Sequence, residues 1–237
     1  MKFKAIVFDI DGCLIDSAPN LIKTLGRAIL DTGGGNYGEE SLRGALGLSA
    51  KAAAGLFDVP DWEQTHRKWC EYYEPLIPEN KPFDGIIPLL KELKSRGYLL
   101  GVATSQDRWM TEVQFPSYPV APYFDLIVCA DDVNKPKPAG DPLLFCAERF
   151  GIRPSEILFI GDAPYDMQCA KAAGAMGALA LWGTPNRDIP ADYYPETPMD
   201  VLGILDEEVV SQKAKRKASK SKSDAVEKRR TERELSI

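Results

Sequence analysis

Two aspartates with a single residue between them, Asp9 and Asp11, directly follow an apolar run. The run, residues 5–8, contains β-branched and aromatic side chains and predicts a short strand buried on both faces. Such a strand delivers Asp9 to the carboxyl edge of a parallel sheet, where α/β proteins place their chemistry. A turn at Gly12 would let the two carboxylates converge, which requires a divalent cation between them or a retained proton. The motif alone does not separate this hypothesis from a solvated strand end.

Further predicted strands also end at polar or acidic residues. Residues 98–103 lead to Thr104 and Ser105, residues 125–130 to Asp131, and residues 157–160 to Asp162, whereas a last strand, 178–181, ends at Trp182. These strands alternate with amphipathic helices, a pattern that predicts βαβ units with right-handed crossovers. The polar side chains are therefore expected at one edge of one sheet.

The segment between the first two predicted strands is different, because it contains helical patterns and no convincing strand. Apolar residues recur at helical spacing in residues 21–30, 39–46, 51–57 and 62–73. We therefore predict an α/β fold in which a Rossmann-like parallel-sheet core comprises residues 1–16 and 83–208. An all-helical cap of residues 17–82 would be inserted into this core.

Composition narrows the class of protein. The 237 residues are 44% apolar and 27% charged, as in ordinary globular proteins. No apolar run approaches the ~20 residues of a membrane span, and the first strand starts too early for a signal peptide. Five cysteines without a CxxC pair predict buried thiols in a reducing, cytoplasmic setting.

The net charge of −6 conceals an asymmetry between the body of the chain and its end. Residues 211–237 hold ten Lys or Arg against four Asp or Glu, so residues 1–210 carry −12. An acidic body argues against nucleic acid as a partner of the core. Residues 209–237 are predicted to be a basic, disordered tail, which could also hold an acidic partner.

Four blocks in this order resemble the haloacid dehalogenase-like hydrolase superfamily: Asp9-Ile10-Asp11-Gly12, Val102-Ala103-Thr104-Ser105, Lys135-Pro136-Lys137-Pro138 and Ile160-Gly161-Asp162-Ala163-Pro164-Tyr165-Asp166. The resemblance covers roughly residues 4–205. It implies that Asp9 is a nucleophile that forms an aspartyl phosphate, and that Asp11 is the general acid and base. It also implies Mg²⁺, held by Asp9, Asp162 and the main-chain carbonyl of Asp11.

The remaining blocks would bind and stabilise the phosphoryl group. Thr104 and the turn at Ser105 suit the phosphoryl oxygens, and a lysine supplies a compact positive charge. Lys135 is chosen over Lys137 because the family's Lys-Pro-x-Pro pattern places the catalytic lysine first; residues 139–141 then look like a small insertion. Asp166 would orient Lys135 or a metal-bound water. The alternative for Asp162 and Asp166 is an acidic helix N-terminus.

Within the family, the chain most resembles phosphoglycolate phosphatases and similar phosphatases of small phosphorylated metabolites. The second aspartate, Asp11, favours phosphoester chemistry, and the all-helical cap and the segment Asp16-Ser17-Ala18-Pro19 fit this subgroup. The cap would close over the site and present residues 47–51 to the substrate. Arg43 and Lys51 are the candidates for binding the substrate's distal end.

Two other functions stay open at this stage. A phosphomutase similar to β-phosphoglucomutase shares the four blocks and the cap, but its cap has an arginine directly after a Gly-Val-Ser-like loop, where this chain has Ala50. The other alternative is a non-catalytic interaction module that binds through the basic tail. The four intact sequence blocks argue against a non-catalytic module.

Overall fold

The computed structural model describes residues 2–184 and 186–208. At its centre lies a five-stranded parallel sheet in the order β5-β4-β1-β6-β7. The strands are β1 (Ala5–Phe8), β4 (Leu99–Ala103), β5 (Leu126–Val128), β6 (Ile157–Gly161) and β7 (Met176–Leu179). The predicted α/β core is confirmed. The last strand starts two residues before the predicted one, because the chain pairs with β6 soon after the preceding helix ends at Ala173.

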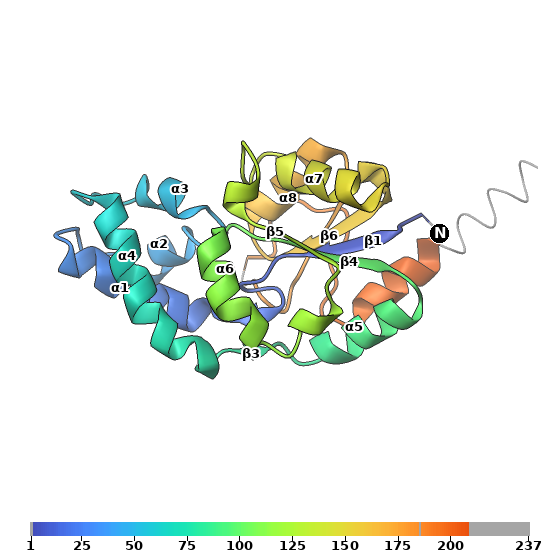
Figure 1. The fold of residues 1–237 in the computed structure, drawn as a ribbon, viewed down its shortest axis with the longest axis horizontal. Coiled ribbons are helices and arrows are strands. Elements are labelled where there is room, and N and C mark those ends of the chain that lie inside the picture. Colours follow the sequence, from blue (N-terminus) through green and yellow to red (C-terminus); the bar gives the residue numbers. More distant parts are fainter. Residues whose placement is uncertain (1, 185, 209–237) are drawn as a thin grey trace, which may run out of the picture.

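Helices cover both faces of the sheet. They are α5 (Ile86–Ser95) and helical residues 200–208 on one face, and α7 (Asp141–Phe150) and α8 (Pro164–Ala173) on the other (Figure 1). Successive side chains of β1 point to opposite faces of the sheet and so contact both layers of helices. Ile6 and Phe8 pack in the cluster with α5, and Ala5 and Val7 pack in the cluster with α7 and α8. Both faces of β1 are buried, as its unbroken apolar sequence predicted.

Four helices form a separate group at one end of the molecule (Figure 1). They are α1 (Ala18–Asp31), α2 (Glu39–Arg43), α3 (Ala50–Ala54) and α4 (Trp62–Tyr73). Their apolar faces meet in a cluster of their own, which includes Ile22, Leu25, Ile29, Leu42 and Phe57. We call these helices the cap. Their separate cluster makes them a distinct layer, with its own small core.

Two chain crossings connect the cap to the core. β2 (Ile15–Asp16) and β3 (Lys81–Pro82) lie side by side as an antiparallel pair, so both crossings run through one narrow ribbon. Sequence patterns did not predict this ribbon, because two residues per strand are too few to show a period. Any movement of the cap relative to the core would have to bend the chain at these two short strands.

The other elements are short. Helix α6 (Arg108–Gln114) follows β4, and 3₁₀ turns occupy Glu74–Glu79, Phe115–Ser117, Ala121–Tyr123, Ala130–Asp132 and Pro154–Glu156. All five cysteines are buried and unpaired, as predicted. Among the described residues, no helix is both long and apolar enough to span a bilayer. The predicted basic tail, residues 209–237, lies outside the described residues.

Candidate active site

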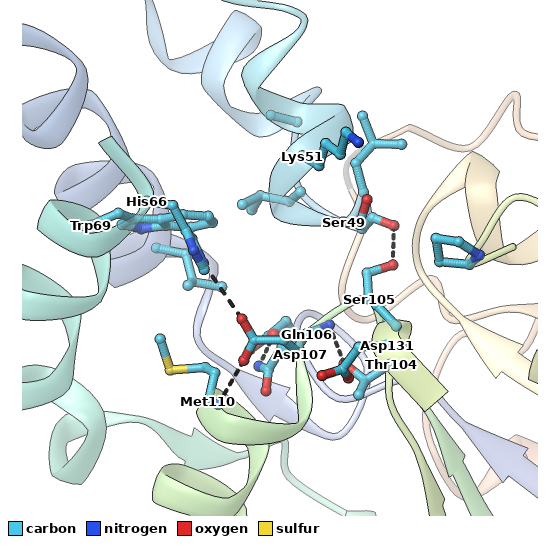
Figure 2. Close-up of a pocket in the computed structure, with 18 of the residues that line it drawn as sticks. Ser49, Lys51, His66, Trp69, Thr104, Ser105, Gln106, Asp107, Met110 and Asp131 are labelled. Carbon is cyan, nitrogen blue, oxygen red and sulfur yellow. Dashed lines mark hydrogen bonds and ion pairs between the residues drawn. The ribbon is translucent and has the colours of Figure 1, made fainter. Parts of the chain in front are cut away.

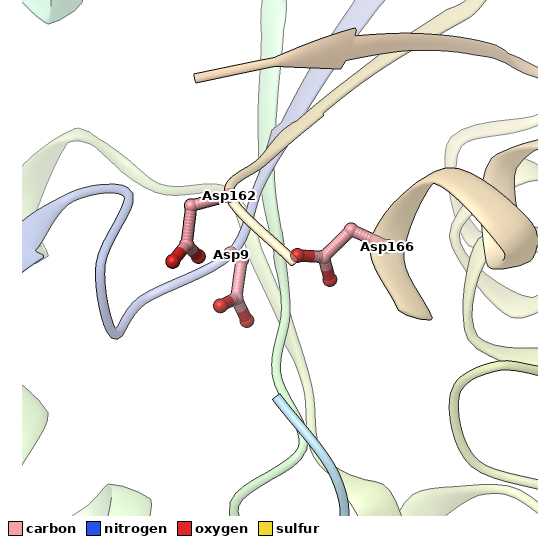
Figure 3. A group of neighbouring side chains, drawn as sticks. All are labelled: Asp9, Asp162 and Asp166. Atoms are coloured by element: carbon pink, nitrogen blue, oxygen red, sulfur yellow. The ribbon is translucent and has the colours of Figure 1, made fainter. Parts of the chain in front are cut away.

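Three buried or half-buried carboxylates meet where β1 and β6 end. Asp9 follows β1, Asp162 follows β6, and Asp166 lies in the first turn of α8 (Figure 3). Each offers an oxygen within 4.8 Å of the others. Gly12 makes this approach possible, because its φ of +78° suits glycine and a Cβ there would lie 2.3 Å from an oxygen of Asp162. The parallel sheet thus brings together acids that are about 150 residues apart in sequence.

Lys137 lies inside this acidic group. Its Nζ is 2.7 Å from Oδ1 of Asp9 and 2.7 Å from Oδ1 of Asp166, and its side chain is fully buried. The second oxygen of Asp166 accepts a hydrogen bond from the backbone N–H of Ala163 at 3.0 Å. Asp166 therefore fixes Lys137 in place, and Lys137 supplies positive charge beside Asp9.

The prediction that Lys135 provides this charge is wrong. Lys135 is exposed in the loop before α7, and the chain turns inward only after Pro136, which carries Lys137 under the site. Two lysines separated by one proline have the same local pattern, so their sequence could not rank them. One signal was available: with Lys137 as the buried lysine, residues 139–141 lead directly into α7 and need not be an insertion.

Burial dominates the electrostatics of the group. It raises the pKa of the Asp9 carboxyl to about 7, against the opposing charge of Lys137. It also raises the pKa of Asp162 well above the usual range, and the charges of Asp166 and Asp9 add to the effect. Burial alone would lower the pKa of Lys137, but Asp166 and Asp9 outweigh it and raise that pKa. Three ionised carboxylates and one ammonium leave two excess negative charges, which a divalent cation would balance.

Asp11 has different surroundings from Asp9. Ser17 donates to its Oδ1 at 2.6 Å, and the amide of Gln106 donates to its Oδ2. Its carboxylate is thus held apart from the group formed by Asp9, Asp162 and Asp166. Burial raises the pKa of Asp11, and these two hydrogen bonds oppose that rise.

The sequence did not point to Gln106. Its side-chain oxygen accepts hydrogen bonds from Gln114 and from Thr111, so the amide is fixed with its N–H groups toward Asp11. Gln114 is completely buried in the last turn of α6. A glutamine in a strand-to-helix turn has no motif that would identify it, and only the packing of α6 reveals its contact with Asp11.

A cavity of about 410 Å³ lies between the cap and the core, and residues of both line it (Figure 2). Asp9, Asp11, Thr104 and Ser105 line its core side. From the cap, the lining includes most of the segment predicted to face the substrate, namely Gly47, Leu48, Ser49 and Lys51. Asp9 and Asp11 therefore line a cavity that the cap partly shields from bulk water.

Arg43 is not among the residues that line this cavity. Its guanidinium pairs with Glu39 at 3.0 Å on the same turn of α2, which is a surface ion pair. The expectation that Arg43 contacts the substrate's distal end is therefore corrected. Lys51 remains at the cavity, with an exposed side chain.

Direct contacts hold the cap against the core on the cavity's rim. The hydroxyl of Ser105 donates to the carbonyl of Gly47 at 2.6 Å, and the hydroxyl of Tyr165 donates to the carbonyl of Gly44 at 3.2 Å. Both acceptors belong to the loop between α2 and α3. This arrangement is a closed one, with the cap loop bonded to the elements that carry the site.

Comparison with known proteins agrees with this geometry. Residues 6–180 match the family model of haloacid dehalogenase-like hydrolases. This chain belongs to that family. It is 31% identical to the N-acetylmuramic acid 6-phosphate phosphatase of Pseudomonas aeruginosa, over 87% of this chain and 96% of that protein. It is also 31% identical to the phosphoglycolate phosphatase of Aquifex aeolicus, over 87% of this chain and 99% of that protein.

Solved structures of the family have the same architecture. A candidate phosphoglycolate phosphatase from Lactobacillus plantarum superposes with a TM-score of 0.79 at 28% identity, covering 86% of this chain and 99% of that one. A hydrolase from Pseudomonas syringae superposes with a TM-score of 0.76 at 26% identity, over 86% and 98% of the two chains. The chain is thus a haloacid dehalogenase-like hydrolase of the phosphoglycolate phosphatase-like subgroup, and its named relatives are phosphatases.

Proposed function

We propose that this hydrolase is a Mg²⁺-dependent phosphatase that cleaves a small phosphomonoester through an aspartyl phosphate on Asp9. The observation that carries the proposal is the pairing of the buried Lys137 with Asp9, a carboxylate that lines the cavity between the cap and the core. A carboxylate beside a fixed ammonium can approach an anionic phosphoryl group, because the ammonium offsets part of the repulsion.

In the first step, the free oxygen of Asp9 attacks phosphorus and the bond to the leaving oxygen breaks. Asp11, held by Ser17 and Gln106, gives its proton to that oxygen. In the second step, Asp11 takes a proton from water, the water oxygen attacks phosphorus, and the bond to Asp9 breaks, which releases phosphate. Thr104, only 2% exposed beside Asp9, offers its hydroxyl to the phosphoryl oxygens.

The donor set fits Mg²⁺, a hard cation that favours oxygen ligands. Asp9 and Asp162, with the main-chain carbonyl of Asp11, would hold it, while both oxygens of Asp166 are already engaged. Bound there, Mg²⁺ would neutralise charge on the phosphoryl oxygens. Lys137, fixed by Asp166, would supply further positive charge beside Asp9.

The test is phosphate release from a panel of phosphoesters with Mg²⁺, including phosphoglycolate, N-acetylmuramic acid 6-phosphate and β-glucose 1-phosphate. We expect release from at least one of them, its loss on chelation and its recovery with added Mg²⁺. Glucose 6-phosphate formed from β-glucose 1-phosphate without free phosphate would identify a phosphomutase instead. No turnover on any ester would leave the interaction-module hypothesis.

The metal ligands can be tested without activity. Mg²⁺ should raise the thermal unfolding midpoint of the wild type, because it binds only the folded site. Asp162→Asn should reduce this rise, whereas Asp58→Asn, an exposed carboxylate in the cap, should not. Equal rises in all three proteins would refute this ligand set.

A further inference from the structure

One face of α4 forms an aromatic stripe over the cavity. Trp62, His66, Trp69 and Tyr73 follow one another at spacings of four, three and four residues, and all four line the cavity. This spacing places them on one side of the helix. The rings are close neighbours: the centroid of His66 is 6.3 Å from that of Trp62 and 6.2 Å from that of Trp69.

Several polar atoms of the stripe are already used within the protein. The indole N–H of Trp69 donates to Thr24 at 3.1 Å, and the hydroxyl of Tyr73 accepts from Asn80 at 2.9 Å. Nε2 of His66 lies 3.5 Å from the Cys70 sulfur. The stripe therefore presents ring surface to the cavity and few groups that could bind sugar hydroxyls.

The charges around the cavity disfavour a second anionic group on the substrate. Among the described residues that line it, Lys51 is the only lysine or arginine, and its side chain is exposed. The same lining includes four aspartates: Asp9, Asp11, Asp107 and Asp131. Asp9 is already paired with Lys137, and Asp11 carries a proton in the proposed first step. A carboxylate or a second phosphate on the leaving group would therefore meet the negative charges of Asp107 and Asp131, with the exposed Lys51 as the lysine of the lining to offset them.

The cavity is also larger than a two-carbon acid requires. Its 410 Å³ lies in the range of ~300–1,000 Å³ that holds drug-sized ligands. Figure 2 shows His66 and Trp69 on the cap side, away from Thr104 and Ser105 on the core side. A substrate whose phosphate lies at Thr104 would need a linker to reach His66 and Trp69.

We propose that the substrate's leaving group ends in a planar, uncharged ring that stacks on three rings of the stripe, those of Trp62, His66 and Trp69. A polyol linker would connect this ring to the phosphate, as in a nucleoside 5′-monophosphate or a flavin mononucleotide. The inference rests on the proposed phosphatase function and specifies its substrate class. Rings of this kind stack on aromatic side chains without requiring hydrogen-bond partners.

Two pairs of substrates isolate the ring. Adenosine 5′-monophosphate is compared with ribose 5-phosphate, and flavin mononucleotide with ribitol 5-phosphate, by measuring kcat/KM for phosphate release. We expect at least one ring-bearing ester to exceed its ringless partner about tenfold or more. The pair with the larger ratio distinguishes a nucleotide from a flavin as the source of the ring.

Variants then locate the ring. Trp62→Ala and Trp69→Leu should each reduce the preference for the ring-bearing ester about fivefold or more, with little change for the ringless one. Trp109→Ala is the matched control, because Trp109 on α6 is 57% exposed and does not line the cavity. If Trp69→Leu fails to fold, Trp62→Ala tests the stripe alone.

The ring-bearing ester should also quench tryptophan fluorescence of Asp9→Asn more than its ringless partner does.

The outcomes separate this inference from the phosphatase proposal. Equal kcat/KM within both pairs, together with release of phosphate, would overturn the ring preference and leave the phosphatase. A preference that survives both tryptophan variants would overturn the assignment to the stripe. Failure to release phosphate from these esters and from the earlier panel would overturn the phosphatase proposal, and this inference with it.

Discussion

The ammonium of Lys137 lies 2.7 Å from the Asp9 carboxylate, in the centre of the site and out of contact with water. An ion pair between buried groups differs from one at the surface, because removing either partner leaves the other as an unpaired buried charge. Asp166, also 2.7 Å from the ammonium, makes the lysine a bridge between Asp9 and α8.

Replacing Lys137 should harm both activity and stability. We expect Lys137→Met to lower kcat/KM by about a hundredfold or more, since one preorganised charge contributes ~10²–10³ in rate. The free energy of unfolding should fall by about 3–5 kcal/mol, because two buried carboxylates lose their partner. Phosphate release and urea unfolding measure the two effects.

Lys135→Met is the matched control for that variant. Lys135 is exposed two residues earlier in the same loop, so its replacement should change kcat/KM less than about twofold and the free energy of unfolding by less than about 0.5 kcal/mol. The reverse order of effects would return the catalytic role to Lys135.

The two aspartates after β1 should fail at different steps. Asp9→Asn should abolish turnover while the protein stays folded, because the amide keeps the shape and loses the nucleophilic charge. Asp11→Asn should slow both proton transfers and let the phosphorylated Asp9 accumulate. Mass spectrometry of the acid-quenched protein would detect the added phosphoryl group. Steady turnover by Asp9→Asn would rule out the covalent mechanism.

Gln106 should matter for the rate more than for substrate binding. In Gln106→Leu, Asp11 loses one of its two side-chain donors and Gln114 loses its acceptor. We expect kcat to fall about tenfold to a hundredfold, as part of the ~10²–10⁴ of acid–base catalysis is lost, with KM changed by less than about twofold.

Gln64→Leu, on the exposed side of α4, is the control for that variant and should leave kcat unchanged. A change in KM alone for Gln106→Leu would show that Gln106 serves binding and not the acid–base group.

Closure of the cap should depend on Gly47. Its φ is +84°, and a Cβ there would lie 2.8 Å from the Cβ of Ala163, on the core side of the closed contact. We expect Gly47→Ala to lower kcat/KM about tenfold, corresponding to about 1.4 kcal/mol, because the closed state becomes strained. Steady-state kinetics measure this effect.

Gly38→Ala provides the comparison, since no atom lies within 4 Å of the Cβ that it would add. It should retain wild-type kinetics. Unchanged kcat/KM in Gly47→Ala would show that this contact does not govern closure.

The sequence by itself determined the core of the protein and the places where its chemistry begins. Apolar strands that end at Asp9, Thr104 and Asp162 and alternate with helices predicted a parallel sheet, because such a sheet is covered on both faces and gathers those strand ends at one edge. Helical spacing likewise indicated α4 with its bounds at Trp62 and Tyr73. These features depend on local periodicity, which the chain displays directly.

Only the tertiary structure decided which side chains face one another. Lys135 and Lys137 are equivalent in local pattern, and burial under the sheet edge selects Lys137. Gln106 contacts Asp11 because α6 packs Gln114 against it, and Arg43 turns to Glu39 instead of the cavity. The direction of a side chain depends on contacts with elements that are distant in sequence, and the order of the residues does not reveal those contacts.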